Sequence, residues 1–193
     1  ALEAKGFELV NAQEPLELAR SIKSGDEIAC ILHVLTVAEM GIARMRAELE
    51  PGMTENELFS ILHQTNIAHG GDWVDYRLLA SGGRTNPWGQ ECSDKMIRAG
   101  ELVAFDTGMI GPYGYGADMS RTILCHPAIP TDEQRRLYNL AIQNIEYNLN
   151  LIKPGVTFRE ISDKGWKLPD EYVTNRYPTP VHGMGMGDEW PMI

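Results

Sequence analysis

Cysteine is scarce in this 193-residue chain, and its spacing excludes two kinds of site. The three cysteines, Cys30, Cys92 and Cys125, are odd in number and lie far apart. Structural zinc sites and disulfide frameworks use closely spaced or evenly paired cysteines. The sequence therefore predicts neither, and it favours a reducing compartment such as the cytoplasm.

Positive charge and long hydrophobic runs are also in short supply. The chain has 17 Lys and Arg against 27 Asp and Glu, for a formal net charge of −10, and no basic cluster. Nucleic acids and anionic membranes are bound through basic patches. The longest apolar run, IACILHVLTVA at 28–38, is interrupted by His33 and Thr36 and is shorter than a membrane span. We therefore expect no nucleic acid or membrane partner, and a small molecule or a protein instead.

Capping boxes divide the chain into helices. Such a box is a Ser or Thr followed three residues later by Glu or Gln, which satisfies free backbone N–H groups at a helix start. Boxes begin at Ser24, Thr54, Thr131 and Thr157, and a shorter helix opens near Pro15. Apolar residues then recur at helical spacing. This pattern predicts helices over about 24–49, 54–69 and 131–153, and another from 157.

An internal repeat suggests that the chain has two similar halves. PGMTENE at 51–57 matches PGVTFRE at 154–160, and each follows a long amphipathic helix. The same shift pairs Leu49 with Ile152 and Ile42 with Ile145. With 43% apolar residues, the chain can bury one good core. We expect one α/β domain in which duplicated helices cover one side of a curved, mostly antiparallel sheet.

The segment LVAFDTGMIGPYGYGADMSRTILC, residues 102–125, predicts a β-hairpin around a Gly-Pro-Tyr-Gly turn. If Pro112 is the centre of the turn, Asp106 stands directly opposite Asp118. Opposed like charges destabilise a sheet unless solvent, a shared proton or a bound cation offsets the repulsion. A solvated hairpin with two incidental acids is the plain alternative. Apolar neighbours and the small Gly108 favour a buried ion site. Residues 72–80, further upstream, alternate in the manner of a strand.

A glycine-rich segment near the end of the chain, RYPTPVHGMGMGDEW at 176–190, carries a third candidate ligand, His182. GMGMG is a weak phosphate loop, because no strongly helical segment follows it. It fits better a strand edge that approaches a ligand closely. Asp106, Asp118 and His182 then supply ligands suited to a divalent metal ion.

The order of Asp106, Asp118 and His182 along the chain resembles that found in the superfamily of creatinase, aminopeptidase P, prolidase and methionine aminopeptidase. This superfamily has the pita-bread fold, which is made of two similar halves. The resemblance implies that Asp106, Asp118 and His182 hold two divalent ions, with iron favoured and manganese, cobalt or zinc possible. The superfamily has two further glutamate ligands downstream of the histidine, and the sequence ends before any such position. We therefore expect residues 1–193 to be a single truncated catalytic domain with an incomplete metal centre, and family habit suggests a homodimer.

Two departures separate this sequence from the peptidases. A peptidase histidine upstream of the first aspartate is replaced by Asn86-Pro87-Trp88-Gly89, and HGMGMGDEWP places Asp188 where HGxGLxxHExP has its second histidine. This pattern resembles the dimethylsulfoniopropionate lyase branch. It implies a metal-dependent elimination that yields dimethyl sulfide and acrylate, with Asp188 as the base. Tyr177, and more weakly Trp88, are the aromatic candidates to contact the sulfonium cation of this carboxylate substrate.

Two other functions stay open from the sequence. The aspartates and His182 are common to both branches, so a metallopeptidase of the aminopeptidase P or prolidase type is the first alternative. The second is a catalytically silent pita-bread module that binds a protein partner. A separate metal cluster of His63, His69, Asp72 and Asp75 is less attractive, because His69 before two glycines is typical of a helix C-terminus.

Overall fold

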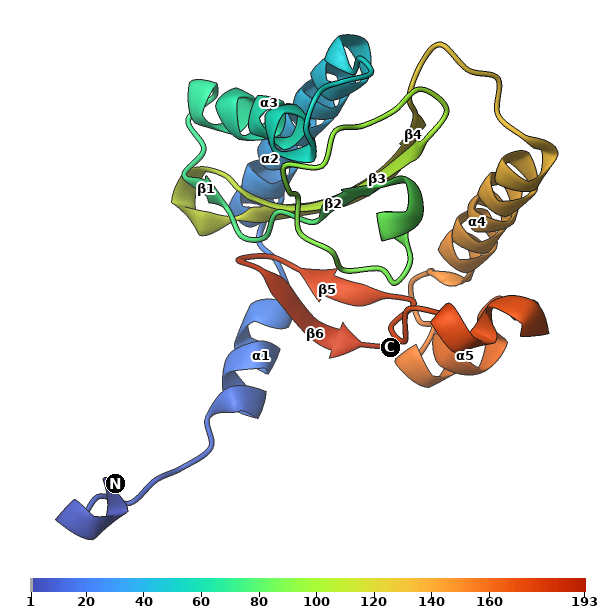
Figure 1. Ribbon diagram of the computed structural model, residues 1–193. Helices are drawn as coiled ribbons and strands as arrows, with labels where there is room; N and C mark the ends of the chain where they lie inside the picture. Colours follow the sequence, from blue (N-terminus) through green and yellow to red (C-terminus); the bar gives the residue numbers. More distant parts are fainter. Residues whose placement is uncertain (1) are drawn as a thin grey trace.

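The structure is a computed structural model that describes residues 2–193 (Figure 1). The helices are α1 (Gln13–Ser21), α2 (Gly25–Glu48), α3 (Glu55–Ala68), α4 (Asp132–Leu151) and α5 (Phe158–Lys164). The strands are β1 (Trp73–Val74), β2 (Leu79–Ser81), β3 (Leu102–Ile110), β4 (Gly116–Leu124), β5 (His182–Met184) and β6 (Asp188–Met192). The α/β composition that the sequence predicted is confirmed.

Each predicted capping box is present at a helix start. The Ser24 side chain accepts a hydrogen bond from the backbone of Glu27, and the Glu27 carboxylate accepts one in return from the Ser24 N–H. Thr54, Thr131 and Thr157 make the same reciprocal pair with the residue three positions later. The boxes were readable because this interaction is entirely local. The helix boundaries agree with the prediction to within about two residues.

The main sheet is built around β3, which pairs antiparallel with β4 on one side and with β1 and β2 on the other. The sequence predicted a single strand over 72–80. This prediction is wrong in the middle of the segment, where residues 75–78 separate β1 from β2. There the backbone N–H of Asp75 donates to the Gly108 carbonyl, and Tyr76 lies against Gly108. The Tyr76 ring therefore occupies the space that the glycine leaves open beside β3.

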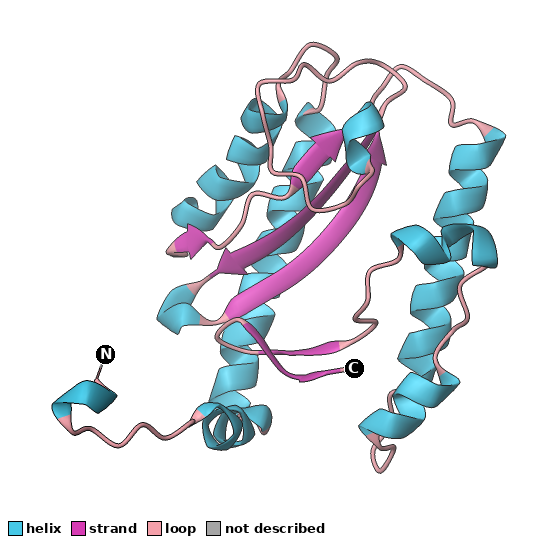
Figure 2. Cartoon of the chain, turned by 60° about the horizontal axis from the view of Figure 1, so that its bottom comes forward, coloured by secondary structure: helices cyan, strands magenta, loops and turns pink. Residues whose placement is uncertain are grey.

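Helices α2 and α3 cover one face of this sheet, as the cartoon in Figure 2 shows. The core between the layers contains Val34 and Met45 from α2, Leu58 and Leu62 from α3, and Phe105 from β3. Helix α2 is long and apolar enough to cross a membrane by length and composition alone. A core helix meets the same criterion, and α2 contributes Val34 and Met45 to this core.

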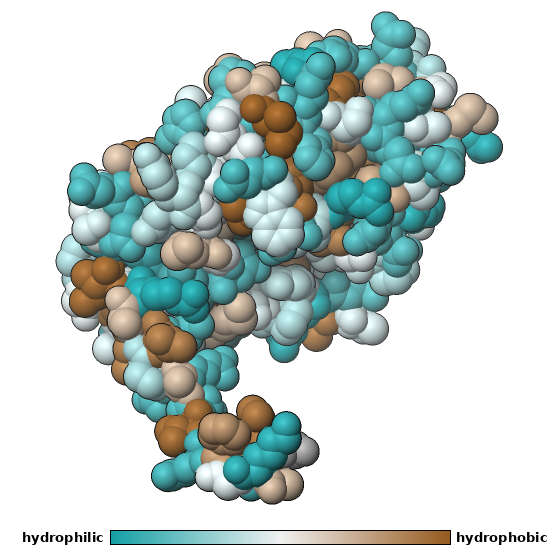
Figure 3. All heavy atoms as spheres, turned by 90° about the vertical axis from the view of Figure 1, so that its left-hand side faces the viewer, coloured by the Kyte–Doolittle hydropathy of each residue, from teal (hydrophilic) through white to brown (hydrophobic). Residues whose placement is uncertain are grey.

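The second half repeats the helix pair beside a smaller sheet. A Pro-Gly turn separates α4 from α5, as another separates α2 from α3. Strands β5 and β6 form a two-stranded sheet that lies below the main sheet in Figure 1. Much of α4 is exposed, including Ile145 and Leu149. The amino-terminal segment stands away from the body of the molecule, as Figure 3 shows.

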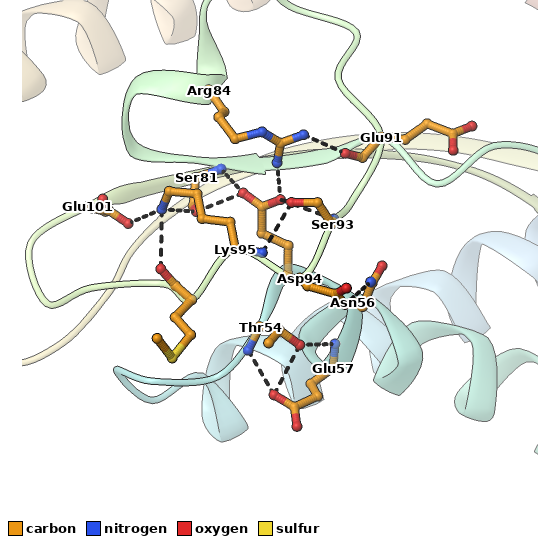
Figure 4. Close-up of polar contacts among 12 residues, drawn as sticks. Thr54, Asn56, Glu57, Ser81, Arg84, Glu91, Ser93, Asp94, Lys95 and Glu101 are labelled. Carbon is orange, nitrogen blue, oxygen red and sulfur yellow. Dashed lines mark hydrogen bonds and ion pairs between the residues drawn. The ribbon is translucent and has the colours of Figure 1, made fainter.

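A buried carboxylate ties the loop after β2 to the start of α3 (Figure 4). Glu55 has no exposed surface. Its carboxylate accepts hydrogen bonds from the backbone and hydroxyl of Ser81, from the backbone and hydroxyl of Ser93, and from Arg84. These donors offset the cost of burying the charge. Both ends of the loop that carries Trp88 are therefore fixed to the same side chain.

Candidate metal centre

Three candidate side chains from two different sheets converge on one point. Asp118 lies in β4, while His182 and Asp188 are the first residues of β5 and β6. The Nε2 atom of His182 lies 2.9 Å from Oδ2 of Asp118, and its Nδ1 atom lies 3.9 Å from Oδ1 of Asp188. One potential ligand atom from each residue lies within 4.8 Å of the others. The group thus contains two of the three predicted ligands, Asp118 and His182, together with the predicted base Asp188 and not the third predicted ligand, Asp106.

The predicted direct opposition of Asp106 and Asp118 is wrong by two positions. Asp106 pairs with Ser120, and Asp118 pairs with Gly108. The reason is the turn, which is centred on Tyr113 rather than on Pro112. Tyr113 has the left-handed backbone conformation, with φ of 63°, and the strands resume only at residue 116. A proline-centred turn was the simpler reading of the sequence, since non-glycine residues rarely adopt positive φ.

A shift of two positions keeps both acids on one face of the hairpin, because side chains alternate with a period of two. Asp106 and Asp118 are therefore diagonal neighbours rather than an opposed pair. The pKa of Asp106 is raised to about 7, first by burial and then by the charge of Asp118 and a hydrogen bond to it. Carboxylates held this close need a proton or a cation between them.

Tyr76 is a site residue that the sequence analysis missed. Its hydroxyl donates a hydrogen bond to Oδ1 of Asp118 at 3.3 Å. The pKa of this hydroxyl lies far above its usual range because of burial, and then because of the negative charges of Asp106 and Asp118. A Cβ atom at Gly108 would lie 2.7 Å from the Tyr76 ring. The signal in the sequence that could have found Tyr76 was Gly108, because a glycine within a strand often marks the close approach of another group.

The orientation of His182 fits a metal ligand. Its Nδ1 lies 2.9 Å from the Gly183 carbonyl, so Nδ1–H is the donor there. This second hydrogen bond directs Nε2 toward Asp118, as in many metal-binding histidines. Burial lowers the pKa of His182, but the Gly183 carbonyl and the neighbouring aspartates outweigh it and the pKa is raised. An imidazole and carboxylates are donor types that divalent ions take, so the residues fit the ions expected there.

Asp188 lies on the other side of the same ring. Its closest approach is to Nδ1, whereas the nitrogen available for a metal faces Asp118. The pKa of Asp188 is raised, chiefly by burial, with His182 lowering it and the charges of Asp118 and Asp75 raising it further. Its side chain is 42% exposed. Asp188 is therefore a carboxylate beside the metal ligands that is open to a substrate.

The two predicted aromatic contacts are not brought to this cluster. Tyr177 is 67% exposed and Trp88 is 39% exposed. A cavity of about 410 Å³ lies beside Asp118 and His182, and neither aromatic residue lines it. Its walls come from α2, α4 and β5, including Ile31, Leu35, Ile145, Asn148 and Met184. The substrate-binding role of Tyr177 and Trp88 stays a prediction.

The fold and this cluster together define a pita-bread metalloenzyme. Residues 29–193 match metallopeptidase family M24, and the chain belongs to this family. The prolidase from Pyrococcus furiosus superimposes with a TM-score of 0.82 at 25% identity, over 93% of this chain and 53% of that one. The Pyrococcus horikoshii prolidase gives 0.82 at 26% identity, over 93% and 52%. The expected fold is confirmed, and membership in the family implies divalent metal ions.

Within the family, the chain is more similar to two lyases than to the dipeptidases compared with it. It is 38% identical to a dimethylsulfoniopropionate lyase, DddP, of Roseovarius nubinhibens and 35% identical to that of Roseobacter denitrificans. Both matches cover 100% of this chain and 44% of the relative. The Xaa-Pro dipeptidase of Pyrococcus furiosus is 28% identical, over 90% of this chain and 50% of the relative. The chain thus spans about half the length of these relatives.

Proposed function

We propose that the protein is a metal-dependent dimethylsulfoniopropionate lyase that releases dimethyl sulfide and acrylate. The observation that carries the proposal is the place of Asp188, a partly exposed carboxylate 3.9 Å from the candidate ligand His182. A base in this position suits abstraction of a proton from carbon, and the reaction requires no activated water. The greater similarity to the two named lyases supports the same choice.

In the proposed reaction, Asp188 accepts the proton on the carbon next to the substrate carboxylate. The electron pair of that C–H bond becomes the double bond of acrylate, while the carbon–sulfur bond breaks and its electron pair leaves with sulfur. Dimethyl sulfide departs as a neutral molecule, and Asp188 then returns its proton to solvent. The raised pKa of Asp188 strengthens the carboxylate as a base.

Asp106, Asp118 and His182 are the residues that would hold the divalent ions. When bound, the ions supply a Lewis acid that binds the substrate carboxylate and stabilises negative charge on the adjacent carbon. The Tyr76 hydroxyl orients Asp118, and the Gly183 carbonyl orients His182. Iron is our favoured metal, with manganese, cobalt or zinc as substitutes, since each binds carboxylate and imidazole ligands.

The substrate carries a sulfonium cation, which aromatic rings and carboxylates can bind. We propose Tyr177 as the principal aromatic contact and Trp88 as the weaker one. Both are exposed enough to reach a ligand. The net charge of −10 also favours a cationic group over an anionic one. We further propose a cytoplasmic homodimer.

A proline-specific metallopeptidase is the second candidate, because the family and the similar dipeptidases point to it. One experiment separates the two. The longest form of the protein that its gene encodes is loaded with iron or manganese and supplied with dimethylsulfoniopropionate or with an amino-acyl-proline dipeptide. Gas chromatography measures dimethyl sulfide, and an amino-acid assay measures proline. We expect dimethyl sulfide alone. Proline alone would reverse the assignment, and neither product would favour the silent binding module.

A further inference from the structure

A buried acid lies next to Asp188 on strand β6. Glu189 is 3% exposed. It accepts a hydrogen bond from the Lys23 ammonium at 2.5 Å and another from the backbone N–H of Met186 at 2.9 Å. The Lys23 side chain is only 13% exposed. This is a largely desolvated ion pair between the α1–α2 connection and the β5–β6 hairpin.

The glycine-rich sequence of the hairpin is shaped around this carboxylate. A Cβ atom at Gly185 would overlap the Glu189 carboxylate, and one at Gly183 would lie 2.6 Å from the Trp190 carbonyl. The sequence predicted that the GMGMG segment approaches a ligand closely. In the structure, Gly183 and Gly185 instead approach β6, the partner strand in the same hairpin. Only glycine leaves room for Glu189 to fold beneath the turn and accept from Met186.

Alternation along β6 connects the ion pair to the metal centre. Adjacent residues of a strand point to opposite faces. Asp188 therefore faces His182, and Glu189 faces Lys23. Two hydrogen bonds hold the hairpin from either side. The Trp190 N–H donates to the Glu17 carboxylate of α1, and the Gly116 N–H donates to the Gly185 carbonyl. A rotation of β6 that broke the ion pair would also turn Asp188 away from His182.

We propose that Lys23 and Glu189 are positioning residues that fix β6 so that Asp188 faces the metal ligands. A buried ion pair contributes little stability compared with a hydrophobic pair of the same size, but it specifies one arrangement of its partners. Lys23 reaches the site only through Glu189, so it touches neither substrate nor metal. The kinetic part of the inference rests on the proposed function of Asp188, whereas the structural part does not.

Amide hydrogen exchange tests the structural part. Lys23→Met keeps the length of the side chain and removes its charge, and Lys23→Arg retains the charge. Lys164→Met is the matched control, because Lys164 forms an exposed ion pair with Glu160 at 3.2 Å. We expect exchange in residues 183–192 to rise about tenfold in Lys23→Met, with β3, the part of β4 after Gly116 and the control variant unchanged. Unaltered exchange in the hairpin would overturn the inference.

Kinetics test the positioning role. In Lys23→Met we expect kcat to fall about tenfold with KM within about twofold, because misalignment of a base affects the chemical step more than binding. Lys23→Arg should restore most of kcat. A loss of thermal stability with kcat unchanged would show a merely structural pair and overturn the proposal. If Lys23→Met does not fold, Glu189→Gln removes the charge while keeping the acceptor for Met186, and the same outcomes apply.

These measurements distinguish this inference from the proposed function. If the unsubstituted protein releases no dimethyl sulfide, the lyase assignment fails, while hydrogen exchange still decides whether Lys23 fixes the hairpin. Manganese affinity, measured by calorimetry, gives a further readout that does not depend on the substrate. Because His182 lies on the same hairpin, we expect affinity to fall about threefold or more in Lys23→Met and to recover in Lys23→Arg.

Discussion

The Nε2 atom of His182 lies 2.9 Å from Oδ2 of Asp118, and this contact joins the two-stranded sheet to the four-stranded sheet. Asp118 is fixed on the longest hairpin of the chain, whereas His182 depends on the docking of a short one. The site is therefore only as well defined as the placement of the β5–β6 hairpin. Changes on either sheet should therefore be measurable in metal binding at this site.

Removing one acid should stabilise the protein without metal and weaken its response to metal. In Asp106→Asn, the repulsion with Asp118 is lost, so the melting temperature of the metal-free protein should rise by about 2–4 °C. The further rise on adding manganese should shrink, because a ligand has been removed. Calorimetric scans with and without chelator measure both effects. A lower metal-free melting temperature with an undiminished manganese response would contradict the assignment of Asp106 as a ligand.

Gly108 should tolerate no side chain, because its Cβ position is occupied by the Tyr76 ring. Gly108→Ala should cost about 1–3 kcal/mol of unfolding free energy and weaken metal binding by displacing the hydroxyl that holds Asp118. Urea unfolding and metal titration measure the two losses. Gly83→Ala is the matched control, since no atom lies within 4 Å of its Cβ position. Equal effects of the two substitutions would exclude a role for Tyr76 packing.

Glu55 should make the protein sensitive to acid. Burial raises the pKa of Glu55, but hydrogen bonds from Ser93, Ser81 and Arg84 outweigh it, so the pKa lies below its usual range. The stabilisation is therefore fully present above the unfolded pKa of about 4.3 and is lost as pH falls through the lower folded value. Glu55→Gln should cost about 3 kcal/mol at neutral pH and should reduce the loss of stability as the pH falls below about 5.

Urea unfolding at a series of pH values measures this dependence. Glu48→Gln is the control, because Glu48 forms an exposed ion pair with Arg44. An acid transition in Glu55→Gln that matches the unsubstituted protein would show that other groups govern it.

The sequence predicted the features of this protein that depend on local interactions. Capping boxes at Ser24 and Thr157 involve residues three positions apart, so they could be read directly and are confirmed. The hairpin was located correctly for the same reason. Its register was not, because the positive φ of Tyr113 moves the centre of the turn by one residue, and residue type gives no sign of this.

Long-range contacts account for the other misses. Tyr76 reaches Asp118 of β4 across strand β3, and Lys23 reaches Glu189 from the far end of the sequence. No local pattern marks such pairs. Asp188, in contrast, was found because it replaces a residue within a recognisable motif. The structure brings it beside His182, and its catalytic role stays a proposal.

The most direct test of the account is Asp188→Asn in the longest form of the protein that its gene encodes. Asparagine keeps the shape of the side chain and cannot accept the proton. We predict that release of dimethyl sulfide falls about a hundredfold or more, with metal content nearly unchanged. Asp163→Asn, an exposed acid on α5, serves as the control and should retain full activity. Undiminished release of dimethyl sulfide by Asp188→Asn would remove Asp188 from the mechanism and contradict the account.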